Sequence, residues 1–325
     1  MSDLVTWGFL STAKINDKLL PGARASDRLE VIAVASRTAD RAEAYAREHG
    51  IERAYGSYEA LLADPDVEAV YISLPNSLHV EWSLRALEAG KHVLCEKPLS
   101  RRPEDVERAF DTADRAGRLL MEAFMYRHNP QTARLVELAE GGAIGRLRVI
   151  RAAFSFPLAD AANVRLSAEL DGGGLMDVGC YCVSGARLLA GEPVEVYGEQ
   201  VVGASGVDEL FAGTLRFPED VLATFDAGLV LPVRDELEAI GEGGSLFLDD
   251  PWHCRTPVLE LRTAGERREI VVEAADSYRL ELENMSDAIR GRAEPLLGRE
   301  DALGQARVIE ALYRSAEEGR AVALA

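Results

Sequence analysis

The chain has 325 residues, which exceeds the size that one hydrophobic core usually serves, so two domains are expected. Apolar residues make up 47% of the sequence and charged residues 28%, as in globular rather than disordered proteins. The 55 acidic and 36 basic side chains give a net charge of -19, which disfavours nucleic acid and anionic membranes as partners. Any anionic ligand would therefore need basic side chains at its own binding site.

The N-terminal residues do not resemble a secretion signal, and no apolar run approaches the ~18 residues of a membrane span. Four scattered cysteines form no CxxC pair, so neither a disulfide framework nor a structural zinc site is expected. These features predict a cytoplasmic protein with reduced, buried thiols and no metal.

Short apolar runs alternate with helical stretches over the first 128 residues. Strands are predicted at 4–9, 29–35, 69–72, 92–95 and 119–123. Helices are predicted at 39–49, 77–89 and 103–116. Parallel strands joined by helices need right-handed crossovers, so residues 1–128 are predicted to form a Rossmann-type domain with a doubly wound parallel sheet.

The strand-like runs become longer after about residue 130. They are predicted at 146–156, 194–202, 210–217 and 221–229, with turn signals at 217–220 and 241–244. Residues 129–325 are therefore predicted to form an α+β domain with a large, mostly antiparallel open sheet, which makes the whole chain α/β. Closing helices are predicted at 278–290 and 299–318, and the sequence leaves open whether the last one packs back on the first domain.

The first predicted strand runs directly into a short loop and a helical stretch, where a dinucleotide pyrophosphate meets helix amides. Only Gly8 matches the glycine fingerprint fully, since Leu10 replaces the second glycine and Ala13 the third. We interpret this segment as a candidate phosphate loop formed by Gly8, Leu10, Ser11, Thr12 and Ala13. An ordinary strand-to-helix turn is the alternative.

The second predicted strand ends at Ser36 and Arg37, where NAD-specific folds usually place an acidic residue on the ribose hydroxyls. A hydroxyl and a guanidinium can instead hydrogen-bond a 2′-phosphate. NADP is therefore the predicted cofactor, with NAD as the alternative. The alternative role for Arg37 is a solvated arginine at the start of a helix.

Several motifs in the same order resemble one known family. They are Leu74 to His79, His92 to Pro98, Met125 to Gln131, Asn163 to Arg165 and Gly172 to Tyr181. Over nearly its whole length the chain resembles the Gfo/Idh/MocA family of dehydrogenases. This resemblance implies a cis peptide bond between Lys97 and Pro98.

Within that family the chain is similar to the branch of NADP-dependent aldose 1-dehydrogenases and dimeric dihydrodiol dehydrogenases. The similarity rests on the imperfect glycine loop, on Ser36 with Arg37, and on Tyr181. The inositol dehydrogenase branch usually has histidine at the position of Tyr181 and is a poorer match.

The resemblance implies that Lys97 and Tyr181 act on the reacting hydroxyl group of the substrate. A substrate alcohol gives its carbinol hydrogen as hydride to a nicotinamide, and its hydroxyl proton to a base. Because a nearby ammonium favours the phenolate form of a tyrosine, Lys97 and Tyr181 are predicted to form one proton-transfer unit.

Asp177 lies four residues before Tyr181 in a segment predicted to be helical from Leu175 to Gly191, so both side chains can project from one face. We predict that Asp177 orients a substrate hydroxyl or joins the proton path. The alternative is an acidic residue favoured by the helix dipole.

The resemblance assigns further residues to the two ligands. The cofactor-binding residues would be Leu74, Pro75, Asn76, His79, Glu96, Lys97 and Arg127. The substrate-binding residues would be Asn163, Arg165, Asp177 and Tyr181. A packing role for His79 and a plain surface charge for Arg165 are the alternatives.

The favoured reaction is oxidation of the C1 hydroxyl of an aldose to a lactone with NADP. The alternatives are a trans-dihydrodiol dehydrogenase, a keto-sugar reductase, an enzyme that keeps its nicotinamide between turnovers, and a nucleotide-binding regulatory protein without turnover. Because the exposed face of the second sheet must be covered, a homodimer or higher homo-oligomer is expected.

Overall fold

The computed structural model describes residues 3–324, which divide into two compact units. The first unit consists of the residues up to Ser100 together with Glu104–Met125 and Asp276–Leu303. The second unit consists of Arg101–Pro103, Tyr126–Ala275 and the residues from Gly304 onward. The domain boundary predicted at residue 128 remains a prediction.

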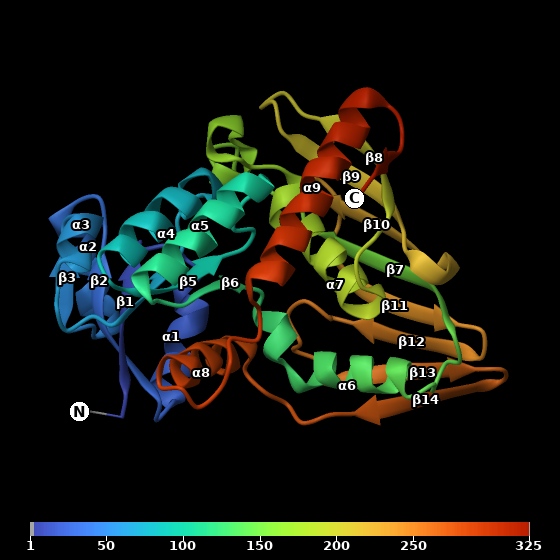
Figure 1. Ribbon diagram of the computed structural model, residues 1–325, viewed down its shortest axis with the longest axis horizontal. Coiled ribbons are helices and arrows are strands. Elements are labelled where there is room, and N and C mark those ends of the chain that lie inside the picture. The colour runs from blue at the N-terminus through green and yellow to red at the C-terminus, as the bar shows by residue number, and fades with distance from the viewer. Residues whose placement is uncertain (1–2, 325) are drawn as a thin grey trace. The chain divides into compact units, whose positions relative to one another are not determined.

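The first unit is built on a parallel sheet whose strand order is β3-β2-β1-β4-β5-β6 (Figure 1). Its strands are β1 (Val5–Leu10), β2 (Leu29–Ala35), β3 (Arg53–Tyr55), β4 (Ala69–Ile72), β5 (His92–Glu96) and β6 (Leu120–Ala123). The strand order reverses between β1 and β4, and ligands of such sheets bind beyond the carboxyl ends of the strands at this reversal. The predicted doubly wound sheet is confirmed.

Six helices belong mainly to the first unit. They are α1 (Asn16–Ala25), α2 (Ala39–His49), α3 (Tyr58–Leu62), α4 (His79–Glu88), α5 (Pro103–Ala116) and α8 (Ser277–Ile289). Helix α8 comes from the far end of the chain and packs on α1. The fully buried Trp7 of β1 donates its indole N–H to the Ser286 hydroxyl of α8 at 3.2 Å, which ties that helix to the sheet.

The second unit is built on a nine-stranded sheet in the order β14-β13-β12-β11-β7-β10-β9-β8-β15. The strands are β7 (Leu147–Ser155), β8 (Glu195–Val202), β9 (Asp208–Arg216), β10 (Leu222–Gly228), β11 (Arg234–Gly241), β12 (Gly244–Asp249), β13 (Val258–Thr263), β14 (Glu266–Val271) and β15 (Val322–Ala323). Only the β7–β10 pair is parallel among the described strands of this sheet, so the predicted, mostly antiparallel sheet is confirmed.

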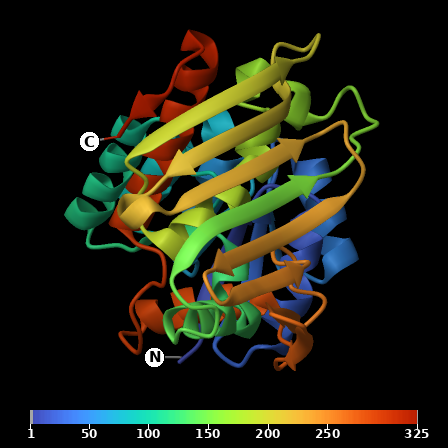
Figure 2. The ribbon, with the colours of Figure 1, turned by 90° about the vertical axis from the view of Figure 1, so that its right-hand side faces the viewer.

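One face of this sheet packs on α7 (Cys180–Ala190), which contacts β7, β10 and β11. Figure 2 shows the strands in front and α7, in yellow-green, behind them. The other two helices of this unit are α6 (Pro130–Glu140) and α9 (Arg299–Glu318), the latter beginning in the first unit. Residues of β9 and β10 alternate between buried and exposed, as expected for a sheet with one open face.

Candidate active site

The loop after β1 is fixed by hydrogen bonds to the end of β4. The Ser11 hydroxyl accepts the Ala13 amide at 3.1 Å and lies 2.8 Å from the Ser73 hydroxyl. The buried Asn16 side chain donates to the Ser11 carbonyl at 2.8 Å and accepts from Ser73 at 2.8 Å. This rigid loop leads directly into the N-terminus of α1, whose dipole favours an anion.

Gly8 lies beneath this loop in the sheet. A Cβ atom at Gly8 would come within 2.7 Å of Leu61 in α3, so the glycine lets the helix pack closely on the strand. This packing explains why a glycine is needed here independently of any phosphate.

Two arginines follow β2, Arg37 just beyond its end and Arg41 in the first turn of α2, and only Arg37 was predicted to bind the cofactor. Ser36 is buried and its amide donates to the Tyr55 carbonyl, whereas Arg37 is exposed. Burial raises the pKa of the nearby Tyr58. The positive charges of Arg37 and Arg41 both oppose that rise, so both guanidinium groups influence the same phenol group. Arg41 follows Arg37 by four residues, and this spacing was the signal that could have revealed it.

His79 connects two of the predicted cofactor loops from a buried position. Its Nδ1 lies 2.9 Å from the carbonyl oxygen of Pro98, and its Nε2 lies 2.8 Å from that of Leu74. With a relative exposure of 1%, the imidazole presents no surface to a ligand. The arrangement favours the packing role and fixes the loop of Pro75 and Asn76 to the end of β5.

The end of β5 contains the expected cis bond between Lys97 and Pro98. Glu96 accepts a hydrogen bond from the Tyr71 hydroxyl, and Leu99 donates its amide to Glu122 at 2.7 Å. These contacts fix the backbone on both sides of Lys97, which is half-buried. The lysine is thereby held at the carboxyl edge of the sheet, where the ligand is expected.

Three successive glycines begin the helix that carries the predicted catalytic residues. A Cβ atom at Gly172 would come within 2.3 Å of the Arg165 carbonyl, and one at Gly173 within 2.1 Å of the Asp208 carboxylate. Asp208 accepts the Leu175 amide at 2.6 Å and the Tyr313 hydroxyl at 2.9 Å. Burial raises the pKa of Asp208 to about 6.

The predicted helix begins as a π-helical turn over Leu175–Gly179 and continues as α7. This wide turn differs from the α-helix expected from residue 175, and such turns are frequent at functional sites. Asp177 lies in it, and its carboxylate accepts the Arg165 Nε at 2.6 Å. The structure therefore joins two of the predicted substrate residues in one ion pair.

Tyr181, at the start of α7, is enclosed by aromatic rings. Its ring centroid lies 5.3 Å from that of Phe154, 5.9 Å from that of Tyr126 and 5.9 Å from that of Trp252. Tyr181 is 6% exposed, and Tyr126 is anchored in turn by a 2.7 Å hydrogen bond to Ser184. These contacts fix the direction of the phenol ring.

The other predicted residues lie on short structured segments. Arg127 is half-buried in the turn Met125–His128, and it adds to the effect of burial in lowering the pKa of His128 to about 3. Asn163 accepts the Arg165 amide at 3.1 Å and thus shapes the loop that presents Arg165. Sequence reasoning did not identify Phe154, Trp252 or His253, because the pairing of β7 with β11 and the turn after β12, which is bound to Asp235, bring them near Tyr181.

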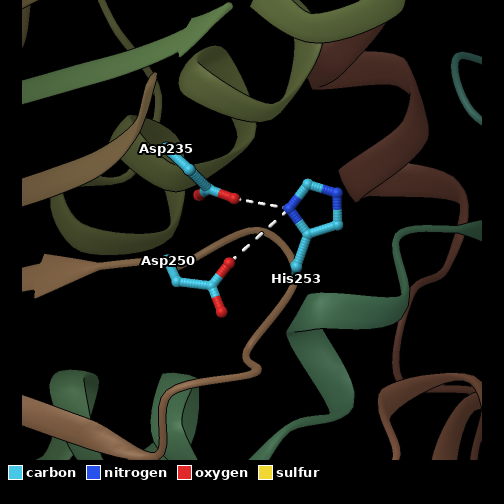
Figure 3. A group of neighbouring side chains, drawn as sticks. All are labelled: Asp235, Asp250 and His253. Atoms are coloured by element: carbon cyan, nitrogen blue, oxygen red, sulfur yellow. Dashed lines mark hydrogen bonds and ion pairs between the residues drawn. The ribbon is translucent and has the colours of Figure 1, made fainter. Parts of the chain in front are cut away.

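Asp235, Asp250 and His253 offer ligand atoms within 4.8 Å of one another (Figure 3). The carboxylates are already satisfied, however: Arg255 donates to Asp250 at 2.7 Å, and the Trp252 amide donates to Asp235 at 3.1 Å. Because a metal would have to displace these donors, we assign no metal to this group.

Comparisons with known proteins agree with the two-part fold. Residues 6–124 match the model described as "Oxidoreductase family, NAD-binding Rossmann fold", and residues 132–247 match the Gfo/Idh/MocA C-terminal domain. The chain is 40% identical to D-xylose 1-dehydrogenase (NADP(+)) 2 of Haloferax volcanii, over 98% of this chain and 99% of that protein.

Two solved structures are similar over nearly the full length. The 3-ketoreductase KijD10 from Actinomadura kijaniata, in complex with NADP and TDP-benzene, has a TM-score of 0.91 and 31% identity, covering 96% of this chain and 98% of its own. The aldose-aldose oxidoreductase from Caulobacter crescentus, complexed with glycerol, has a TM-score of 0.92 and 29% identity, covering 99% and 100%. The chain therefore belongs to the Gfo/Idh/MocA family of oxidoreductases.

Proposed function

We propose that this protein is an NADP-dependent sugar dehydrogenase that oxidises the C1 hydroxyl of an aldopyranose to a lactone. The observation that carries the proposal is the start of the Tyr181 helix, where Arg165 fixes Asp177 and aromatic rings fix Tyr181 one helical turn later. The rings of Tyr126, Phe154 and Trp252 around Tyr181 form an aromatic wall. Together with the pair of Asp177 and Arg165, this wall suits a small polyhydroxylated substrate. The 40% identity to an NADP-dependent xylose dehydrogenase supports the same substrate class.

The residues of the first unit suit a phosphorylated dinucleotide. Arg37 is exposed just beyond β2, Arg41 lies in the first turn of α2, and both oppose the rise in the pKa of Tyr58, so two cations lie near one ring in a chain with net charge -19. We propose that both bind the 2′-phosphate, and that the Ser11–Ala13 loop with the N-terminus of α1 binds the pyrophosphate. A nicotinamide held by these residues would supply the hydride acceptor for the reaction.

The side chains of this protein handle the proton and the orientation of the substrate. We assign Tyr181 to take the proton of the C1 hydroxyl, with the Lys97 ammonium favouring its phenolate form and hydrogen-bonding the reacting oxygen. Asp177, oriented by Arg165, binds a neighbouring hydroxyl. His79 acts as a positioning residue that holds the Asn76 loop.

A turnover screen tests this proposal. Purified protein is mixed with aldoses, inositols and trans-dihydrodiols, each with NADP and with NAD, and reduced cofactor is measured at 340 nm. Aldoses with NADP should give the highest kcat/KM, and the product should be the lactone. Turnover confined to dihydrodiols or inositols would contradict the substrate assignment, and no turnover on any of them would favour a regulatory protein.

A keto-sugar reductase is the second candidate, because the fold matches a 3-ketoreductase with a TM-score of 0.91. Reduction of a keto-sugar with NADPH at a rate well above aldose oxidation would favour it. An enzyme that retains its nicotinamide between turnovers would instead absorb near 340 nm as purified, and would oxidise one aldose only while reducing another.

We also propose a homodimer formed through the open face of the second sheet. This face has a hollow of about 500 Å³ lined by ion-paired side chains, among them Arg234, which lies 2.6 Å from Asp226. A charge reversal, Arg234→Glu, should shift the mass measured by light scattering to that of a monomer. An unchanged mass would direct the search to another surface.

We also propose that the protein resides in the cytoplasm. The four cysteines are buried and unbridged, which suits a reducing compartment. Among residues 3–324, the structure contains no helix that meets the length and apolarity needed to cross a membrane.

A further inference from the structure

His253 is the exposed, polar member of the aromatic group around Tyr181. The Phe154 ring meets Tyr181 edge-on at 5.3 Å and His253 edge-on at 5.5 Å, so both rings rest on the same side chain. Tyr181, Phe154 and Trp252 are buried, whereas the His253 side chain is 40% exposed. The imidazole therefore forms a polar border to the aromatic wall.

One ring nitrogen of His253 is held by a buried carboxylate. Nδ1 lies 2.5 Å from Asp235, which is 7% exposed, and 3.6 Å from Asp250. Nε2 has no hydrogen-bond partner within residues 3–324, and Figure 3 shows it on the side of the ring away from both carboxylates. The second nitrogen is thus available to a ligand.

Two hydrogen bonds to Asp235 hold the loop that carries His253 against the sheet. The Asp250 amide donates to the Asp235 carbonyl at 2.8 Å, and the Trp252 amide donates to the Asp235 carboxylate at 3.1 Å. Asp235 lies directly opposite Phe154 in the strand register. The ring is therefore preorganised, as a residue that recognises a substrate should be.

We propose that His253 selects the substrate by hydrogen-bonding one of its hydroxyl groups through Nε2. This inference rests on the proposed function, which puts the reacting carbon at Tyr181. A hydroxyl group both donates and accepts, so it suits the imidazole in either protonation state. The ligand class is a polyhydroxylated ring whose apolar face packs on the aromatic wall.

Two conservative variants separate recognition from folding. The amide nitrogen of Asn overlays Nδ1 and keeps the bond to Asp235, so His253→Asn should fold normally and lose only the substrate contact. Its KM for the preferred aldose should rise about five- to tenfold, the loss of one neutral hydrogen bond, with kcat and NADP affinity nearly unchanged. The amide nitrogen of Gln overlays Nε2, so His253→Gln should recover part of the affinity.

Deoxy sugars identify the hydroxyl, and His49→Asn is the matched control. His49 also pairs with an aspartate, lying 3.5 Å from Asp17 in the first unit, and its variant should behave as wild type. One monodeoxy analogue should bind wild type more weakly than the parent aldose does. The same analogue and the parent aldose should bind His253→Asn equally well.

An unchanged KM for His253→Asn, or equal discrimination among the deoxy analogues in both proteins, would overturn the inference. A stoichiometric metal that Asp250→Asn abolishes would also overturn it, by assigning the group to an ion. Tyr181→Phe distinguishes a failure of the proposed function from a failure of the His253 role. If Tyr181→Phe retains turnover, the proposed function fails. If Tyr181→Phe loses turnover while the KM of His253→Asn is unchanged, only the role of His253 is refuted.

Discussion

Asp208 gives a stability prediction that can be worked out from the structure. Its buried carboxylate accepts the Leu175 amide and the Tyr313 hydroxyl, and it holds the glycine turn that leads to Asp177 and Tyr181. Burial raises its pKa from 3.8 to about 6, so the native protein binds this proton more tightly than the unfolded chain. The corresponding stability is complete below pH ~4 and is lost as the pH rises through about 6.

The magnitude follows from the shift of roughly two pKa units, which corresponds to about 3 kcal/mol of unfolding free energy. About 1.4 kcal/mol of this falls between pH 5 and pH 7.5, a range that stays above the sequence pI of 4.8. Asp208→Asn does not titrate. Wild type should therefore lose about 1.4 kcal/mol relative to the variant as the pH rises across this range.

Urea unfolding of both proteins, followed by tryptophan fluorescence at pH 5, 6 and 7.5, measures this difference. The difference in unfolding free energy should change steadily with pH in favour of the variant. A constant difference, or one that changes in favour of wild type, would refute the raised pKa of Asp208 in the native protein.

Three further predictions concern the cofactor, the pH dependence and the substrate. Arg37→Ala should weaken the binding of NADP about tenfold and leave the binding of NAD nearly unchanged, the tenfold loss being at the lower end for hydrogen bonds to a charged group because the side chain is exposed. Equal losses of affinity for both cofactors in fluorescence titrations would contradict the phosphate assignment. Burial lowers the pKa of His92 to about 4, and its Nδ1 accepts the Leu119 amide. Wild type should therefore lose stability relative to His92→Gln as the pH falls from about 6.5 toward 4, and a melting-temperature difference between the two proteins that does not change with pH would argue against this. Asp177→Asn should reduce kcat more than NADP affinity, and a variant that loses only thermal stability would support the helix-dipole role.

The parallel sheet was predictable because its strands are buried on both faces. Ala69–Ile72 is a continuous apolar run with all four residues buried, and both ends were predicted correctly. The helices Ala39–His49 and Pro103–Ala116 were also predicted to the residue, since each has a helical apolar period. The three-residue strand β3 is too short to show any period and was not predicted.

The outer strands of the second sheet escaped prediction for the opposite reason. All residues of β14 are exposed or half-exposed, as suits an edge strand, so its sequence reads as polar loop. The π-helical turn at Leu175–Gly179 was expected to be α-helix, because the spacing of apolar residues shows neither the hydrogen bond from the Leu175 amide to Asp208 nor the close packing at the preceding glycines.

The candidate site was predictable only where residues lie in contiguous motifs. Lys97, Asp177 and Tyr181 were found through the family resemblance. His253 was missed because its proximity to the Tyr181 cluster depends on a strand register, Asp235 opposite Phe154, that one sequence does not specify.

The most direct test of the account is the turnover of the Lys97→Met, Tyr181→Phe and double variants with the preferred aldose and NADP. If the two side chains form one proton-transfer unit, each single change should lower kcat by roughly 10²–10⁴-fold. The double variant should then be little worse than the poorer single variant, because groups that act together are strongly non-additive. Fully multiplicative losses, or near-normal turnover by Tyr181→Phe, would contradict the unit and show that the proton leaves by another route.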